Sequence, residues 1–363
     1  MESRILRIAT RKSALALAQT TQAAESIVAA NKVAGGTSHD IAGGTAANLS
    51  YELVGLTTEG DRRLDKSLAS FGGKGVFIKE LEVALLEGRA DIAIHSLKDM
   101  PAEVLPEFKI AAVLKREDPR DAFISRGSVS SAVSGQSSAA PRFMDLPSGA
   151  RVGTGSIRRV VQLKALRPDL EYVPIRGNIQ TRIQKLAGDS ANGIPPLDGV
   201  VLAAAGLKRM GLADQITEYF PTEQMLPASG QGILAIETLS SCYPEPSGSS
   251  SLADILSRVN DPRTYCIAVA EMAYLKALNA GCQFPVASFA EFEGPADVCS
   301  EIGAANFAGD ADVLKIRGIY WDEKSQKLLR AECHANVKMG DDAEKSARAL
   351  GIELAEQIKQ QLA

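Results

Sequence analysis

The sequence contains few histidines, and its cysteines do not occur in closely spaced pairs. Its three histidines, His39, His95 and His334, lie far apart and lack the spacing of a zinc site. The cysteines are widely spread and odd in number: Cys242, Cys266, Cys282, Cys299 and Cys333. This pattern argues against a His-based metal centre and against a disulfide framework. It indicates a protein of the reducing cytosol, so we expect a cytoplasmic location.

The chain also lacks long apolar runs and a strong charge of either sign. No apolar run approaches the ~20 residues of a membrane span, and no apolar signal core follows the charged N-terminus. The formal net charge of −4 argues against nucleic acid as a bulk partner. What the chain does have is 363 residues, 45% of them hydrophobic, which is enough for two or three domains with conventional cores.

Residues 88–101, GRADIAIHSLKDMP, combine a short predicted strand with polar residues at its end. Ile92 and Ile94 alternate with small or polar neighbours, which predicts a strand that ends near His95. The polar residues that follow are Ser96, Lys98 and Asp99. Ligands of open α/β sheets bind just beyond the carboxyl ends of strands, so a carboxylate here could face a cation. The alternative is an ordinary turn with solvated charges.

The preceding segments predict the rest of a first α/β unit. Residues 4–9 and 51–57 have the pattern of strands, and residues 77–85 that of an amphipathic helix. This strand–helix–strand order implies a parallel sheet. Ser13 is a candidate N-cap of a long helix, and Arg11 beside its first turn suits an anion. Simple capping with a surface arginine is the alternative.

A second predicted unit, from residue 149 onward, places arginines after successive strands. Thr154 and Ser156 lie where strand 151–153 turns into a helix, and Arg158 replaces the third glycine of a dinucleotide loop. Residues 170–175 form the next predicted strand. The arginines that follow these two strands are Arg158, Arg159, Arg176 and Arg182. Such a cluster in an acidic protein predicts binding of a polycarboxylate or a polyphosphate.

Two segments, 115–123 and 225–237, are predicted to cross between the two units, which suggests hinged lobes with a site in the cleft. Residues 243–251 are a Pro/Ser/Gly linker, and a smaller third unit follows. Low-complexity insertions occupy 33–50 and 127–142, and residues 58–75 form a charged, glycine-bearing loop. We expect domain 1 from 1–115 and 230–240, domain 2 from 116–229, and domain 3 from 252–363.

Several motifs, in this order and spacing, resemble the hydroxymethylbilane synthase (porphobilinogen deaminase) family. They are RIATRKSALALAQ, TEGD, GGKGVFIKELEVALLEGRADIAIHSLKDMP, REDPRDAF, VGTGSIRR, RPDLEYVPIRGNIQTR, LAAAGLKRMGL, LPASGQG and GCQFPVA. The resemblance runs along nearly the whole chain. It implies an α/β fold with two hinged lobes like those of type II periplasmic binding proteins, and a small α/β C-terminal domain with an antiparallel sheet.

The resemblance also implies a chemistry: stepwise deamination and joining of porphobilinogen into a linear tetrapyrrole for haem. Asp99 would be the catalytic carboxylate, and Cys282 would carry a dipyrromethane cofactor as a thioether. The further residues implied to bind the cofactor are Ser13, Ser96, Lys98, Thr154, Ser156, Arg158, Arg159 and Arg176. Those implied to bind substrate are Arg11, Gln19, Lys74, Arg176 and Arg182. We expect a monomer.

Two positions depart from the family pattern. Glu271 is followed by Met272 instead of arginine, and Ala280 stands where the family usually has the first of two glycines before the cysteine. Both departures concern the seating of the cofactor loop. By its residues alone, Cys282 is a lone cysteine without a nearby histidine to activate it.

Two other classes of function share part of this pattern. A two-lobed anion-binding module without catalysis would use the same arginines, but the third domain and the missing signal segment argue against it. A nucleotide-dependent oxidoreductase is weakened by the incomplete glycine loop. Intact mass separates the three, because only the enzyme would carry a covalent adduct.

Overall fold

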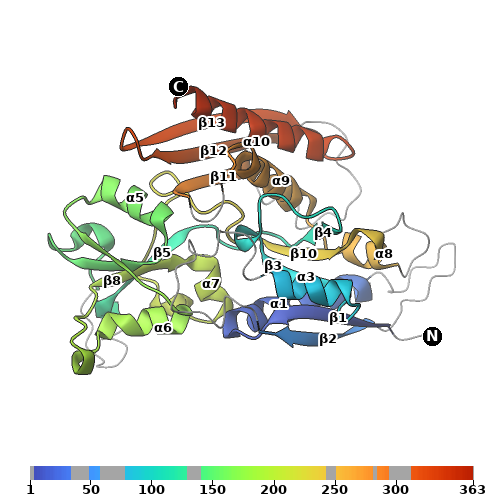
Figure 1. Ribbon diagram of the computed structural model, residues 1–363, viewed down its shortest axis with the longest axis horizontal. Coiled ribbons are helices and arrows are strands. Elements are labelled where there is room, and N and C mark those ends of the chain that lie inside the picture. Colours follow the sequence, from blue (N-terminus) through green and yellow to red (C-terminus); the bar gives the residue numbers. More distant parts are fainter. Residues whose placement is uncertain are drawn as a thin grey trace.

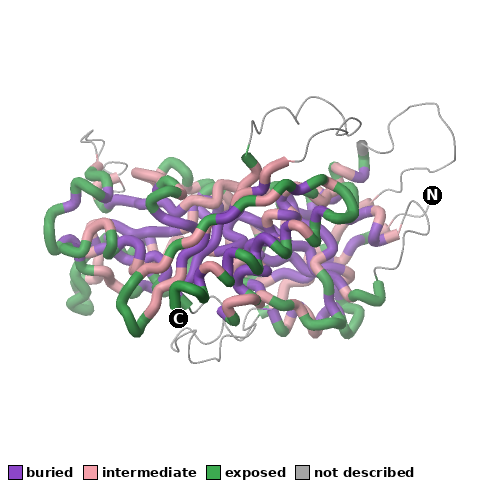
Figure 2. Tube along the Cα trace, turned by 90° about the horizontal axis from the view of Figure 1, so that it is seen from above, coloured by how far each residue is buried: buried purple, intermediate pink, exposed green. Residues whose placement is uncertain are grey.

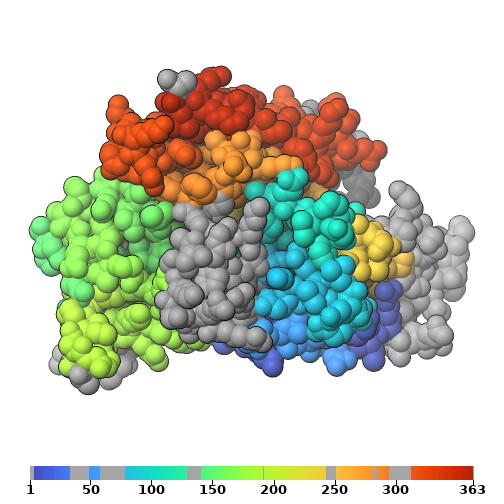
Figure 3. All heavy atoms as spheres, in the orientation of Figure 1, coloured from blue at the N-terminus to red at the C-terminus, as the bar shows by residue number. Residues whose placement is uncertain are grey.

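A computed structural model describes residues 4–33, 49–57, 78–128, 140–242, 251–280, 284–293 and 312–362. These residues form two five-stranded sheets and one three-stranded sheet, each with its own helices (Figure 1). The two larger units lie side by side, and the C-terminal unit lies across both of them (Figure 3). Cys282, Lys74 and most of the two predicted insertions, the 58–75 loop and the linker lie outside the described residues.

The first sheet has the strand order β2-β1-β3-β10-β4. Its strands are β1 (Arg4–Arg11), β2 (Leu49–Leu56), β3 (Ile92–Ser96), β4 (Phe108–Val113) and β10 (Leu234–Leu239). β1 runs parallel to β2 and β3, as predicted, but β10 runs antiparallel to both β3 and β4. The sheet is therefore mixed rather than parallel, because β10, which follows the second sheet in the chain, runs opposite to its two neighbours.

Helices cover both faces of this sheet, and the alternation of β3 explains how. Ile92 and Ile94 lie in the core under α1 (Ala14–Val33), whereas Ala93 lies in the core under α3 (Lys79–Leu86). A third helix, α8 (Leu252–Ser257), packs its leucines into the same core as α1. By its packing α8 belongs to the first lobe, although we had expected residues from 252 onward in the third domain.

The second sheet has the order β7-β6-β8-β5-β9 and carries a core on each face. Its strands are β5 (Asp121–Ser125), β6 (Arg151–Thr154), β7 (Glu171–Pro174), β8 (Gly199–Ala203) and β9 (Glu218–Tyr219). Its helices are α5 (Ile157–Leu166), α6 (Ile179–Gln184) and α7 (Ala204–Arg209). Part of the predicted crossing 115–123 is thus the start of β5, a fully buried strand that pairs antiparallel with β8.

The third unit is an antiparallel meander of β11 (Val286–Glu293), β12 (Asp312–Asp322) and β13 (Lys327–Val337). Two helices, α9 (Pro262–Ala277) and α10 (Ala343–Gln360), bury their apolar residues against the sheet and against each other. The buried Tyr274 hydroxyl donates to the Ile319 carbonyl at 3.0 Å, which ties α9 to β12. Figure 2 shows buried backbone running through the interior and exposed residues along the rim.

The two crossing segments meet at a buried ion pair that anchors the third unit. Glu117 N donates to Gly232 O at 3.2 Å, so the segments run side by side. Arg116 Nη1 donates to Glu271 Oε1 of α9 at 2.7 Å, and Glu271 is fully buried. Glu271 also accepts from the backbone N–H groups of Gly230 and Ala290. The next residue, Met272, packs against apolar clusters.

Within the described residues, no helix is both long and apolar enough to cross a membrane.

Candidate functional site

The carboxyl ends of β1 and β3 bring several predicted site residues to one edge of the first sheet. Arg11 is the last residue of β1, and Ser96 is the last of the adjacent parallel strand β3. Ser13 caps α1, because Ala16 N donates to Ser13 Oγ at 3.3 Å. The buried Gln19 accepts from Ser96 Oγ at 3.2 Å. The residues predicted to bind cofactor and those predicted to bind substrate therefore meet here.

A short 3₁₀ turn, Leu97–Asp99, follows β3 and separates an anchor from two charged side chains. Leu97 is fully buried, and its N–H donates to Ile233 O at 3.0 Å. Lys98 is partly buried and Asp99 is exposed. Burial lowers the pKa of Lys98, and the adjacent Asp99 carboxylate opposes that effect. The turn thus fixes its backbone by an apolar residue and leaves Asp99 open to a ligand.

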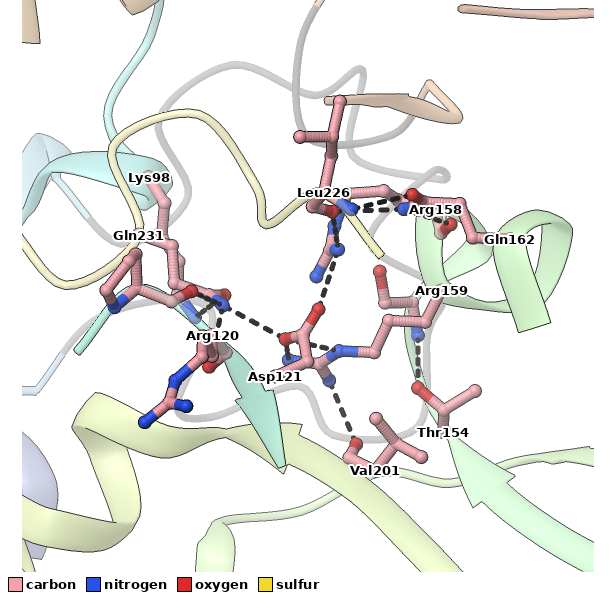
Figure 4. Close-up of polar contacts among 12 residues, drawn as sticks. Lys98, Arg120, Asp121, Thr154, Arg158, Arg159, Gln162, Val201, Leu226 and Gln231 are labelled. Atoms are coloured by element: carbon pink, nitrogen blue, oxygen red, sulfur yellow. Dashed lines mark hydrogen bonds and ion pairs between the residues drawn. The ribbon is translucent and has the colours of Figure 1, made fainter. Parts of the chain in front are cut away.

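On the second sheet, Arg158 and Arg159 of α5 converge on one buried carboxylate, Asp121 at the start of β5 (Figure 4). Arg158 Nη1 donates to Asp121 Oδ2 at 2.8 Å, and Arg159 Nη2 donates to Oδ1 at 2.8 Å. The arginines are only 4% and 5% exposed, so they are not solvated surface residues. Each also donates to a backbone carbonyl: Arg158 to Leu226 and Arg159 to Val201.

This arrangement keeps Asp121 ionised. Burial alone would raise the pKa of Asp121, but the charges and hydrogen bonds of Arg158 and Arg159 outweigh it and hold that pKa far below its usual range. Desolvation also lowers the pKa of Arg158, with Asp121 opposing it. One negative charge therefore balances only one of the two guanidinium groups.

The turn before α5 explains the glycine of the incomplete nucleotide loop. A Cβ on Gly155 would lie 2.6 Å from Ile175 O, so only glycine allows β6 and β7 to end this close together. The buried Thr154 hydroxyl accepts from Ser156 N at 3.4 Å. Ser156 stands at the N-cap position of α5 without a side-chain capping bond. Gly155 is therefore explained by the close packing of β6 and β7.

Arg176 and Arg182 extend the positive charge beyond the end of β7. Arg176 is exposed, and Arg182 is partly buried with its Nε donating to Gly177 O at 2.7 Å. Burial lowers the pKa of Arg182; the charge of Arg159 acts in the same direction and that of Asp99 opposes it. Asp99 from the first lobe is thus an electrostatic neighbour of Arg182 from the second.

The site is a cationic cluster shared between the two lobes. We use that name for Lys98, Arg158, Arg159, Arg176 and Arg182. Among the described residues, Asp99 and Asp121 are two carboxylates that act on this group of five positively charged side chains, so positive charge is in excess within it. Such an excess suits a ligand with several carboxylates, and guanidinium groups match carboxylate geometry.

Sequence reasoning missed two residues of this site, Asp121 and Gln231. Both lie in quoted motifs, REDPRDAF and LPASGQG, but neither was singled out. A usable signal existed for Asp121: a charged residue directly before the apolar run of a buried strand needs a charged partner. Gln231 gave no comparable signal, because its role depends on two segments distant in sequence.

Two protein-family models match most of the chain. The family model described as "Porphobilinogen deaminase, dipyromethane cofactor binding domain" matches residues 6–242, and "Porphobilinogen deaminase, C-terminal domain" matches residues 265–360. The chain belongs to the porphobilinogen deaminase family. A porphobilinogen deaminase of Syntrophus aciditrophicus is 42% identical and covers 97% of this chain and 94% of the relative. One from Sorangium cellulosum is 38% identical, with 98% of both chains covered.

Solved structures give weaker likenesses. An ABC transporter structure from Parabacteroides distasonis has a TM-score of 0.35 at 11% identity and covers 75% of this chain and 78% of that chain. The GluR0 ligand binding core complex with L-glutamate has a TM-score of 0.28 at 12% identity, and the match covers 74% of this chain and 96% of that chain. With such scores, the two-lobed architecture rests on the sheets themselves. These confirm the expected α/β lobes with a small antiparallel C-terminal domain.

Proposed function

We propose that this chain joins porphobilinogen molecules one after another into the linear tetrapyrrole hydroxymethylbilane, with loss of ammonia at each addition. Membership of the porphobilinogen deaminase family supports this reaction. The observation that carries it is the position of Asp99, an exposed carboxylate at a strand exit beside the cationic cluster. That site offers one negative charge for a developing cation and several positive charges for carboxylates.

The residues present fit a dipyrromethane, whose acetate and propionate groups are anionic. The excess positive charge of the cationic cluster suits such a ligand, and the family model that matches residues 6–242 is named for this cofactor. When bound, the dipyrromethane supplies the pyrrole carbon to which the first substrate is joined. We propose Cys282 as its attachment point. Lys98, Arg158 and Arg176 would hold its carboxylates, with Ser13, Ser96, Thr154 and Ser156 as further polar groups.

Asp99 is proposed as the catalytic group. When porphobilinogen loses ammonia, positive charge develops on its pyrrole ring, and a fixed carboxylate nearby lowers the energy of that state. Leu97 fixes the turn by its buried side chain and its bond to Ile233. The backbone that bears the carboxylate is thus fixed before the charge develops, which favours efficient stabilisation.

The arginines are proposed to orient substrate. Arg176 is exposed and Arg182 is partly buried, so a propionate or acetate from solvent can reach Arg176 most easily. Arg159 donates from all three of its nitrogens to Asp121 and Val201, so it contributes mainly charge and support. Arg11, Gln19 and Lys74 complete the proposed substrate contacts. Holding both reacting partners lowers the barrier by removing the entropy of their encounter.

The test combines mass and turnover. Purified protein should carry a covalent adduct on the peptide that contains Cys282, and it should release ammonia and form hydroxymethylbilane from porphobilinogen. Cys282→Ser should fold, carry no adduct and be almost inactive, whereas Cys242→Ser should behave as wild type. An unmodified, active wild-type protein would refute the cofactor assignment. A protein that binds carboxylates but never releases ammonia would instead be the anion-binding module.

We further propose that the chain acts as a cytoplasmic monomer. The cysteine pattern supports the location, and sedimentation at enzymatic concentrations would measure the state of association.

A further inference from the structure

Gln231 is a buried amide between the two lobes, and neither the family pattern nor the motifs gave it a role. It lies in the returning crossing segment and is 1% exposed. Lys98 Nζ donates to Gln231 Oε1 at 3.3 Å, while Gln231 Nε2 donates to Asp121 Oδ1 at 3.0 Å (Figure 4). Nε2 also donates to Pro119 O at 2.7 Å. One side chain therefore contacts a charged residue from each lobe.

The backbone around Gln231 leaves that side chain little freedom. Gly230 and Gly232 both have positive φ, +73° and +91°. A Cβ on Gly230 would lie 2.8 Å from Leu97 Cγ, and one on Gly232 would lie 2.3 Å from Glu117 O. Arg116 Nε donates to Gln231 O at 2.8 Å. The segment is thus clamped between the turn that bears Lys98 and the outgoing crossing segment.

The polarity of the amide matches its two neighbours in only one orientation. Its oxygen faces an ammonium group, and its NH₂ faces a carboxylate and a carbonyl. The reverse orientation would oppose donor to donor and acceptor to acceptor. Asp121 in turn is bonded to Arg158 and Arg159, so the chain of contacts runs from Lys98 to both guanidinium groups.

We propose that Gln231 is a positioning residue that sets Lys98 of the first lobe relative to the Asp121–Arg158–Arg159 group of the second. The inference rests on the proposed function, because it assigns Lys98 to a carboxylate of the cofactor. The amide acts through Lys98 and does not touch the reacting atoms. Misplacing a charged group by about 1 Å in a preorganised site costs up to about a hundredfold in rate.

Two substitutions should shift the pKa of Lys98 in opposite directions. Gln231→Met keeps the volume but removes the acceptor, so the pKa of Lys98 should fall, because it loses a bond that favours the charged form. Gln231→Glu adds a negative charge at the same place, so that pKa should rise by about one unit or more. The charged groups that act on Lys98 in both variants are Asp99, Asp121, Arg158 and Arg159.

The experiment titrates Lys98 by NMR after ¹³C reductive methylation of the holoenzyme and measures kcat and KM for porphobilinogen on unmethylated protein. A Lys98→Arg variant assigns the resonance. Both Gln231 variants should lose about tenfold or more in kcat/KM. The control is Gln224→Glu, which makes the same charge change at an exposed position near the same segment and should leave both readouts at wild-type values.

The outcomes separate this inference from the proposed function. Unchanged Lys98 titration in both Gln231 variants overturns the inference, even if kcat/KM falls, because the effect then does not pass through Lys98. Should Gln231→Glu fail to fold, Gln231→Met alone decides by the same criterion. A wild-type enzyme without turnover of porphobilinogen refutes the proposed function instead, whatever Lys98 does.

Discussion

The two lobes each place a carboxylate beside positive charge, but in opposite surroundings. Asp99 follows the end of β3, is exposed, and lies on a turn that the buried Leu97 anchors. Asp121 is the first residue of β5 and is fully buried, and its oxygens accept hydrogen bonds from Arg158, Arg159 and Gln231. A carboxylate that must meet a transient charge needs access. One that holds arginines in place needs burial and saturated hydrogen bonds.

The largest expected effect separates the two carboxylates by stability. Asp121→Asn removes the negative charge that is bonded to both buried arginines, Arg158 and Arg159, so it should destabilise the protein by about 3–5 kcal/mol. Asp99→Asn should leave the free energy of unfolding near the wild-type value, because its carboxylate is exposed. Urea denaturation of both variants measures this difference. Equal losses in the two variants would break the comparison.

For turnover, in contrast to stability, we expect the large effect at Asp99. Asp99→Asn keeps the size but removes the charge, so the adduct should still form while turnover falls by about 10²–10³-fold or more. Asp99→Glu retains a displaced charge and should keep more activity than the asparagine variant. Initial rates of ammonia release and intact mass are the measurements. Near-wild-type turnover in Asp99→Asn would make this residue structural.

Arg158 should tolerate neither loss of its charge nor loss of its shape. Arg158→Leu should make the free energy of porphobilinogen binding less favourable by roughly 1.5–3 kcal/mol for each charged hydrogen bond that is lost. Arg158→Lys should also be impaired, because an ammonium group cannot span Asp121 and the Leu226 carbonyl as the planar guanidinium does. The same reasoning applies to Arg159. Binding of porphobilinogen and kcat/KM are the readouts, and unchanged kinetics in both lysine variants would contradict this prediction.

The pH dependence of stability should also show the contribution of Asp121. Its folded-state pKa lies far below the unfolded value, so its contribution to stability is present above the unfolded pKa and is lost as pH falls toward the folded one. With a pKa of about 3.9 in the unfolded protein, the contribution of Asp121 to the free energy of unfolding should fall by about 1.3 kcal/mol between pH 7 and pH 3. The stability gap between wild type and Asp121→Asn should narrow by that amount. A constant gap would mean that the pKa of Asp121 is the same in the folded and the unfolded protein, so that Arg158 and Arg159 do not lower it.

The smallest effect sets the scale for an exposed ion pair. Arg348 Nη2 and Glu344 Oε1 lie 2.6 Å apart, one turn apart on α10, and both are about half exposed. Breaking this pair with Arg348→Ala should cost only about 0.3–0.5 kcal/mol, because water and salt screen it. Urea denaturation at low and high salt would check both the size and its loss on screening. A cost like that of Asp121→Asn would show that burial is not the deciding variable.

Local patterns determined much of this protein. The strand patterns of residues 4–9 and 51–57 predicted β1 and β2, alternating apolar residues predicted β3, and amphipathic spacing predicted α3, because these periods are present in the sequence itself. The order of the motifs identified the family, which the family comparison confirmed. Asp99 and the arginines were singled out because polar residues after a strand share the carboxyl edge of its sheet.

Tertiary structure decided what those patterns left open. The first sheet is mixed because β10 returns from the second lobe, and α8 joins the first lobe by packing its leucines there. Arg158 and Arg159 looked like candidates for an external anion, yet each is bonded to Asp121, which lies 37 and 38 residues earlier. Gln231 reaches Lys98 across 133 residues of sequence. Which charge is buried, and beside which partner, depends on contacts between distant segments, and no local period encodes them.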